Sequence, residues 1–225
     1  MCFRDLLNLS LQFMRKKSLR ERRDVKKLSN YTMDLVDKIL PIFEAYKNED
    51  DIEVEIRLGK HNGTLFDTNV GKDVWNRVLI GLKKYDLWEK TLNSTTDVFY
   101  NDANKIRISN DEETGEQSMI QKVTISKEDF IRDPLDVRFC VAREIPICGE
   151  YDMDRKRTKV RNSFIRKNLS IDMTISSGDN VDMDSEEESS YQIELEIMKP
   201  SDVDSIYKLK NILQKIDDLM KLIPT

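Results

Sequence analysis

Apolar and polar residues alternate through most of the chain between residues 51 and 198, and this pattern limits the possible folds more than any other feature. Successive side chains of a strand point to opposite faces of a sheet, so a period of two predicts strands. The predicted strands cover 51–60, 95–100, 105–109, 118–126, 136–147, 157–165, 169–176 and 191–198. Turn-rich segments such as "NDEETGE" separate them. We therefore expect a mainly β protein with about eight antiparallel strands in a sheet that closes into a barrel.

Amphipathic helical patterns flank and interrupt these strands. We expect a helical segment over 1–50 that packs on the barrel, with Pro41 causing a kink or an early stop. A second helix is predicted at 72–88 and a third within 201–225, where Ser201 and Asp204 form a plausible N-terminal cap. With the barrel at 51–200, these elements make a single domain.

Charge is unevenly distributed along the chain. The formal net charge is −5, yet 15–27 and 155–167 are strongly basic, so an anionic partner is not excluded. Residues 1–27 fit either an amphipathic basic helix or a mobile arm, and the acidic segment 176–190 lacks an apolar pattern and is predicted to be a disordered loop.

The cysteines indicate a reducing environment. Cys2, Cys140 and Cys148 are scattered, which predicts a reduced, intracellular protein rather than a disulfide framework. No apolar run approaches the ~20 residues that span a bilayer, so we expect no membrane partner.

The predicted strands have one apolar and one ionisable face. In "DIEVEIRLGK", Glu53, Glu55 and Arg57 lie opposite four aliphatic residues, and "YQIELEIM" places Glu194 and Glu196 in the same way. The other strands carry polar faces with Arg107, Lys122, Arg138 and Glu144, then Arg157, Lys159, Arg161, Asp172 and Thr174. If the three helices cover the apolar face from outside, the charged faces line the inside of the barrel. The alternative is an ordinary solvated face, as on many antiparallel sheets.

The two Glu-x-Glu pairs indicate a cation. Alternate side chains of a strand lie ~7 Å apart, so like charges there repel unless a positive charge intervenes. Oxygen ligands alone suit Mg²⁺ or Mn²⁺, and fixed Lys and Arg suit a phosphate-rich ligand. A divalent cation with a basic clamp is a recurring arrangement for phosphoryl transfer. The sequence has no G-x-x-x-x-G-K motif and only one histidine, so it is neither a P-loop enzyme nor a His-based triad enzyme.

The segments "EVEIRLGK", "RTKVRNSF", "SIDMT" and "YQIELEI" resemble the fungal and viral metal-dependent RNA 5′-triphosphatases of the triphosphate tunnel family. These are the first enzymes of mRNA capping. The segments "LKKYDLWEK", "DEETGE" and "DVRFCVAREIPI" are most similar to the branch from large DNA viruses. The resemblance covers about residues 50 to 200 and implies a closed barrel with a polar lumen.

The resemblance also implies roles for individual residues. It implies a metal on Glu53, Glu55, Glu194 and Glu196, basic phosphate ligands at Arg107, Lys122, Lys159 and Arg161, and Glu144 as the acid that positions water. Asp172 and Thr174 match supporting polar residues, and Arg57, Arg138 and Arg157 are further candidates for substrate binding. Two positions depart from related patterns: Arg57 replaces the Lys of the small-molecule branch, and Gln192 replaces a Glu of fungal members.

The implied reaction is in-line attack of water on the γ-phosphorus of triphosphate-ended RNA, with Mg²⁺ or Mn²⁺ as cofactor. Nucleoside triphosphates would be side substrates, and a separate guanylyltransferase is expected because the sequence has no Lys-x-Asp-Gly motif. Two alternatives remain: a tunnel phosphatase for tripolyphosphate or nucleoside triphosphates, and a non-catalytic, phosphate-binding subunit of a capping complex.

Overall fold

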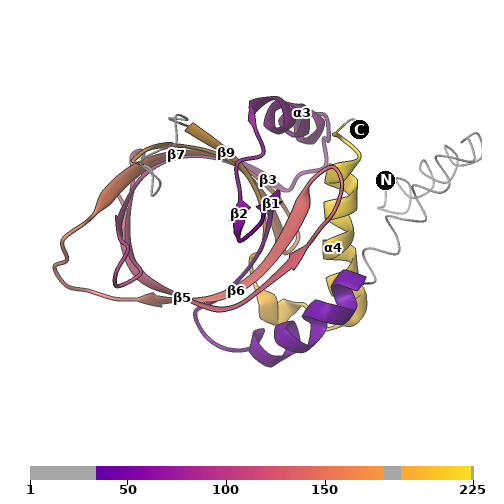
Figure 1. Cartoon of the computed structure of the whole chain (residues 1–225), viewed down its shortest axis with the longest axis horizontal. Helices are drawn as coiled ribbons and strands as arrows, with labels where there is room; N and C mark the ends of the chain where they lie inside the picture. The colour runs from indigo at the N-terminus through magenta and orange to yellow at the C-terminus, as the bar shows by residue number, and fades with distance from the viewer. Residues whose placement is uncertain (1–33, 180–188, 224–225) are drawn as a thin grey trace, which may run out of the picture.

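Eight strands form a closed antiparallel barrel in the computed structural model, which describes residues 34–179 and 189–223 (Figure 1). The strands are β1 (Ile52–Asn62), β3 (Lys90–Asn101), β4 (Ile106–Asp111), β5 (Gln117–Phe130), β6 (Asp136–Pro146), β7 (Arg155–Arg166), β8 (Leu169–Gly178) and β9 (Ser189–Ile197). Their order around the barrel is β1-β6-β5-β4-β3-β7-β8-β9, and pairing of β9 with β1 closes it. The predicted barrel is confirmed, and most strands are longer than the sequence pattern indicated.

A short ninth strand, β2 (Leu65–Asp67), folds back on the end of β1. Gly59 allows this close approach, because a Cβ atom there would lie 2.1 Å from the carbonyl oxygen of Asp67. The first predicted strand ends at residue 60, whereas β1 continues to Asn62 and His61 pairs with Phe66.

The register places the polar faces of the strands on the same side of the sheet. Glu55 is the Cα partner of Glu196, and Glu194 is the partner of both Arg57 and Asp172. On the other wall, Lys122 pairs with Glu144. Residues directly opposite each other share a face, so the ionisable faces converge inside the barrel.

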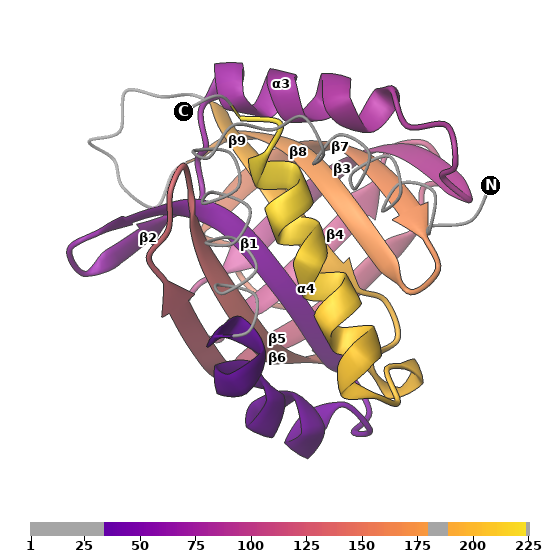
Figure 2. The ribbon, with the colours of Figure 1, turned by 90° about the vertical axis from the view of Figure 1, so that its right-hand side faces the viewer.

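Three helices cover part of the apolar outer surface: 34–46, α3 (Lys72–Lys83) and α4 (Ile206–Met220). Figure 1 and Figure 2 show α4 lying along the outside of the barrel beside β1, with α3 on the outer surface next to it. Fully buried side chains of the two longer helices pack with those of β1, β6 and β9 in one core: Leu35, Ile39, Phe43, Leu209, Leu213, Ile216, Ile56, Leu58, Phe139, Ile193 and Leu195. This outer core stabilises the barrel, because its lumen is filled with charges rather than apolar side chains.

Three helix boundaries differ from the prediction. The helix does not stop early at Pro41, which lies inside helix 34–46 between the buried side chains of Leu35 and Phe43. Helix α3 ends at Lys83 instead of residue 88, and the indole of Trp88 folds back to donate a hydrogen bond to the Leu82 carbonyl at 2.8 Å.

The C-terminal helix begins later than its predicted cap. Ser201 lies in a 3₁₀ turn, Pro200–Asp202, and α4 begins at Ile206 with Ser205 as the N-cap that accepts from the Lys208 amide. The cap motif covers only four residues, so the sequence pattern alone did not distinguish Ser201 from Ser205 as the N-cap.

Two predicted segments lie partly or wholly beyond the described residues. The basic arm or helix of 1–27 falls outside them, as does most of the predicted loop 176–190. The ends of that loop are strand, since β8 continues to Gly178 and β9 begins at Ser189. Among the described helices, none is long and apolar enough to cross a membrane.

Candidate active site

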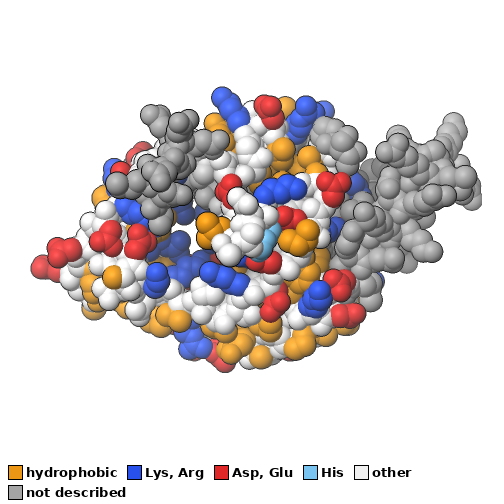
Figure 3. Space-filling model, viewed as in Figure 1, with side chains coloured by type: hydrophobic (Ala, Val, Ile, Leu, Met, Phe, Trp, Pro, Cys, Tyr) orange, Lys and Arg blue, Asp and Glu red, His pale blue; other side chains and the backbone are white. Residues whose placement is uncertain are grey.

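A ring of ionisable side chains constricts the lumen of the barrel. Figure 3 shows Lys and Arg side chains gathered at the hollow on this face of the molecule. The constriction leaves a cavity of about 40 Å³, lined by five carboxylates and five basic groups: Glu53, Glu55, Asp172, Glu194, Glu196, Arg57, Arg107, Lys122, Lys159 and Arg161. Every lining residue belongs to the set predicted from strand alternation and family resemblance.

Lys122 is placed among three carboxylates. Its Nζ lies 3.5 Å from Glu55 Oε1 and 3.3 Å from Glu144 Oε1, and it also forms an ion pair with Glu53. Arg107 binds the same Glu144 oxygen at 2.5 Å. Burial raises the pKa of Glu144, but Arg107 and Lys122 outweigh it, so the net pKa is lowered and this carboxylate stays ionised.

Two arginines hold Glu194 from opposite sides. Arg57 contacts Glu194 at 3.1 Å and Glu55 at 2.7 Å, while Arg161 lies 3.6 Å from Glu194 and 3.3 Å from Asp172. Burial raises the pKa of Glu194, but the positive charges of Arg57 and Arg161 outweigh burial and lower the pKa to about 2. Glu194 is therefore a permanent negative charge in the constriction.

Two other glutamates have too little positive charge nearby. Burial, together with Glu55, raises the pKa of Glu53 to about 7 despite its contact with Lys122. Burial, together with Asp172, raises the pKa of Glu196, and Glu196 forms no ion pair with any described residue. An added cation beside these side chains would favour their charged forms.

The four remaining predicted residues border the constriction or lie farther along the barrel. Glu144 joins it through its ion pairs, and buried Thr174 accepts from Arg161 Nε at 3.1 Å. Arg157 donates to the Ser176 hydroxyl at 2.7 Å and to nearby carbonyls. Arg138 binds both oxygens of Asp129 at 2.7 Å and lies over the Phe66 ring. The roles assigned to these residues stay predictions.

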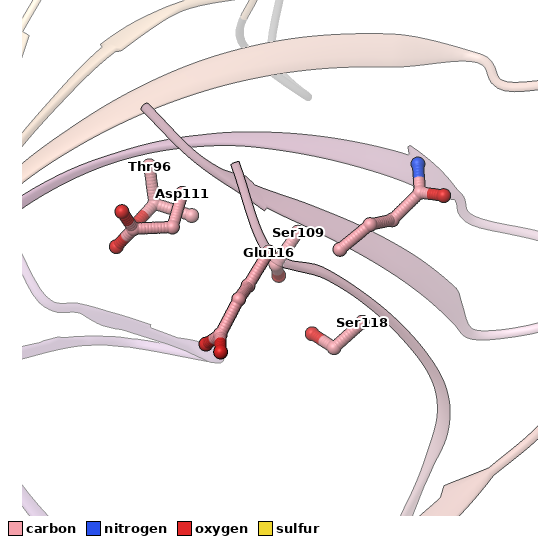
Figure 4. A pocket seen from close by; sticks show the side chains of 6 residues that line it. Thr96, Ser109, Asp111, Glu116 and Ser118 are labelled. Atoms are coloured by element: carbon pink, nitrogen blue, oxygen red, sulfur yellow. The ribbon is translucent and has the colours of Figure 1, made fainter. Parts of the chain in front are cut away.

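The sequence analysis missed a second, larger cavity of about 490 Å³ beside the turn between β4 and β5 (Figure 4). It is lined by hydroxyls, an amide and two acids: Thr96, Ser109, Asp111, Glu116, Gln117 and Ser118. Strand alternation could have found part of it, because Ser109 and Asp111 share the parity of Arg107 along β4.

The donor set fits a divalent cation, although it is not preassembled. Among residues 34–179 and 189–223, no three His, Cys, Asp or Glu side chains are arranged to hold a metal ion. Lys122 and Arg57 separate the carboxylates instead. Oxygen-only donors on adjacent strands, with raised pKa values at Glu53 and Glu196, are nonetheless the chemistry that Mg²⁺ or Mn²⁺ prefers.

Comparisons with known proteins agree with this architecture. The family model described as "mRNA capping enzyme, beta chain" matches residues 84–223, more than half of the chain. The match begins after β1, so it does not include Glu53 and Glu55. A search of curated proteins by sequence gives no match.

Solved structures show the same fold. The Pct1 RNA triphosphatase of S. pombe has a TM-score of 0.66 at 15% identity, and the alignment covers 84% of this chain and 90% of that one. The Mimivirus capping enzyme triphosphatase has a TM-score of 0.58 at 16% identity, covering 84% of this chain and 97% of that one. Another structure shows Pct1 in complex with the Spt5 CTD. It has a TM-score of 0.66 at 16% identity, and the alignment covers 84% of this chain and 90% of that one.

Proposed function

Because this chain belongs to the family of mRNA capping enzyme beta chains, the mRNA triphosphatases, we propose that it removes the γ-phosphate of triphosphate-ended nascent RNA in a metal-dependent reaction inside the barrel. The product would be diphosphate-ended RNA, the substrate for the next capping step. The observation that carries the proposal is the constriction, in which five carboxylates face five basic side chains within a closed tunnel.

Charge balance explains why this constriction suits a triphosphate together with a cation. Its acids and bases are equal in number, so a triphosphate alone would add several negative charges beside the glutamates. Like charges at such short distances repel strongly where water is scarce. A divalent ion on Glu53, Glu55, Glu194 and Glu196 would offset that repulsion and polarise the γ-phosphoryl group when bound.

The basic residues of the opposite wall would hold the phosphates. Lys159 forms no ion pair with a described residue, although it shares a side-chain hydrogen bond with Tyr100. Arg161 lies 3.3 Å from Asp172 and 3.6 Å from Glu194, and both basic groups would have to exchange these contacts for a phosphate oxygen. Their charge would oppose the negative charge that develops on the transferring phosphoryl group. Arg107 and Lys122 bring further positive charge to the same space.

Glu144 is the best-placed residue to orient the attacking water. Arg107 and Lys122 fix its carboxylate and keep it ionised at neutral pH. An ionised carboxylate accepts a hydrogen bond from water and directs a lone pair of the water toward phosphorus. No covalent intermediate is required.

Two expectations about ligands and partners follow. Nucleoside triphosphates present the same phosphates and are proposed as side substrates. We also propose a guanylyltransferase as a partner, because the diphosphate-ended RNA produced here is the acceptor for the cap nucleotide.

Substitution of one glutamate on each metal-binding strand tests the proposal. Glu53→Gln and Glu194→Gln should each abolish metal-dependent phosphate release from triphosphate-ended RNA while preserving the circular dichroism spectrum. Glu116→Gln, in the other cavity, is the matched control and should retain release. Full release by the Glu53 and Glu194 variants would exclude the proposed metal site.

A further inference from the structure

The two ends of the tunnel differ in charge. At the end marked by the turn between β3 and β4, the lumen side of the strands presents Tyr100, Arg107 and Arg155, which are Cα partners in the sheet. At the end marked by the turn between β4 and β5, the corresponding residues are Asp111 and Glu116. Along this wall, the constriction lies between two arginines at one end and two acids at the other, so the wall attracts a polyanion from the first end only.

Tyr100 and Arg155 form a fixed stacked pair at the basic end. The Arg155 guanidinium lies over the Tyr100 ring, 3.9 Å from its centroid. Asp102 holds that guanidinium by two hydrogen bonds, at 2.8 Å from Nε and 3.1 Å from Nη2. The bidentate contact fixes the plane of the arginine, and Tyr100 itself remains half-buried, so part of its side chain is accessible.

The surroundings of this pair lead into the constriction. Arg107 and Lys159 line the constriction and also lie close enough to Tyr100 to act on it electrostatically. Burial raises the pKa of Tyr100, but Lys159 and then Arg107 and Arg155 outweigh it, so the net pKa is lowered. Positively charged side chains therefore extend from Tyr100 to the predicted phosphate ligands of the constriction.

The constriction cannot also hold the nucleoside of the substrate. A cavity of about 40 Å³ has room for little more than one water molecule before its side chains move. When the triphosphate enters, the first nucleoside must stay outside. Stacking on an aromatic side chain with a cationic neighbour is the common way to hold a base without reading its identity.

We propose that Tyr100 and Arg155 form a stacking platform for the 5′-terminal nucleoside of the RNA, which enters the tunnel at this basic end. The platform separates RNA and nucleoside triphosphates from bare polyphosphate, because only the first two have a base to stack. The inference rests on the proposed function for its ligand class.

Equilibrium binding tests the platform independently of catalysis. The ligands are an RNA trinucleotide with a 5′-(β,γ-imido)triphosphate and free imidotriphosphate, both uncleaved at the γ-position, each titrated with Mn²⁺ at one ionic strength. Tyr100→Ala should weaken RNA binding about tenfold, within the range for loss of one base–aromatic stack. Imidotriphosphate binding should change by less than about twofold, and Tyr100→Phe should retain RNA binding because it keeps the ring.

The outcomes separate this inference from the proposed function. An equal loss for both ligands in Tyr100→Ala would mean that Tyr100 only supports Lys159, and no loss for either would mean that the ring is not contacted; both overturn the platform. Wild-type protein that binds the RNA no tighter than imidotriphosphate also overturns it. Tyr100-dependent RNA binding without phosphate release from cleavable RNA would uphold the platform and reject the proposed function.

Discussion

Binding of Mn²⁺ to the glutamate wall should weaken about tenfold between about pH 8 and about pH 6. The pKa of Glu53 is raised to about 7 by burial and by Glu55, and a metal binds only the ionised carboxylate. With that value, roughly one molecule in eleven has Glu53 ionised at pH 6 and roughly ten in eleven at pH 8, a ratio of about ten. The affinity for Mn²⁺ falls as the pH falls, because protons compete with the metal for the Glu53 carboxylate below its pKa.

Titration of free Mn²⁺ by electron paramagnetic resonance at several pH values measures this dependence. Glu53→Gln cannot ionise, so its affinity should be weaker and nearly constant over the same range. Glu116→Gln should keep the wild-type pH dependence, because Glu116 lies in the other cavity. A wild-type affinity that does not change with pH, or a tenfold change that persists in Glu53→Gln, would refute the assignment of Glu53 as a metal ligand.

Two other predictions concern phosphate binding and stability. Arg161→Ala should lower kcat/KM on triphosphate-ended RNA about 100-fold or more, since it removes the positive charge that opposes the charge developing on the transferring phosphoryl group. Arg143→Ala, which breaks an ion pair with Glu49 on the outer face, should change kcat/KM less than about twofold. Equal effects of the two substitutions would contradict the role of Arg161 in the site. Asp217→Ala should lower the free energy of unfolding by about 3–5 kcal/mol in urea titrations, because it leaves the buried Arg132 without this carboxylate, bound at 2.5 Å. Asp204→Ala, at an exposed ion pair, should leave the free energy of unfolding nearly unchanged. A similar loss in both variants would show that the buried Arg132–Asp217 pair does not stabilise the fold.

The barrel and its polar lumen could be predicted because strand parity is a local property. Once Glu53 and Glu55 lie opposite aliphatic residues that the helices cover, their side of the sheet must be the inside. The same parity found each of the ten residues of the constriction. Side-chain contacts could not be predicted, because they depend on how strands far apart in sequence meet across the lumen. Nothing local to Lys122 shows that it lies among Glu53, Glu55 and Glu144.

The features that sequence reasoning missed are long-range or cooperative. The helix through Pro41 persists because burial of Leu35 and Phe43 outweighs the lost hydrogen bond of the proline. The pairing of Arg132 with Asp217 joins the loop after β5 to α4 across 85 residues of chain, a separation that no pattern in either segment reveals. Tyr100 looked like an ordinary strand residue until the register placed it beside Arg107 and Arg155.

Release of γ-phosphate from triphosphate-ended RNA tests the central claim most directly. The wild-type chain would be assayed with Mg²⁺, with Mn²⁺ and with EDTA, with ATP added as a competitor. Release is expected with a divalent cation and not with EDTA, and ATP should compete with the RNA because it presents the same triphosphate and a base. A folded protein that releases no phosphate with either metal, or that releases it fully in EDTA, would contradict a metal-dependent RNA triphosphatase built on this constriction.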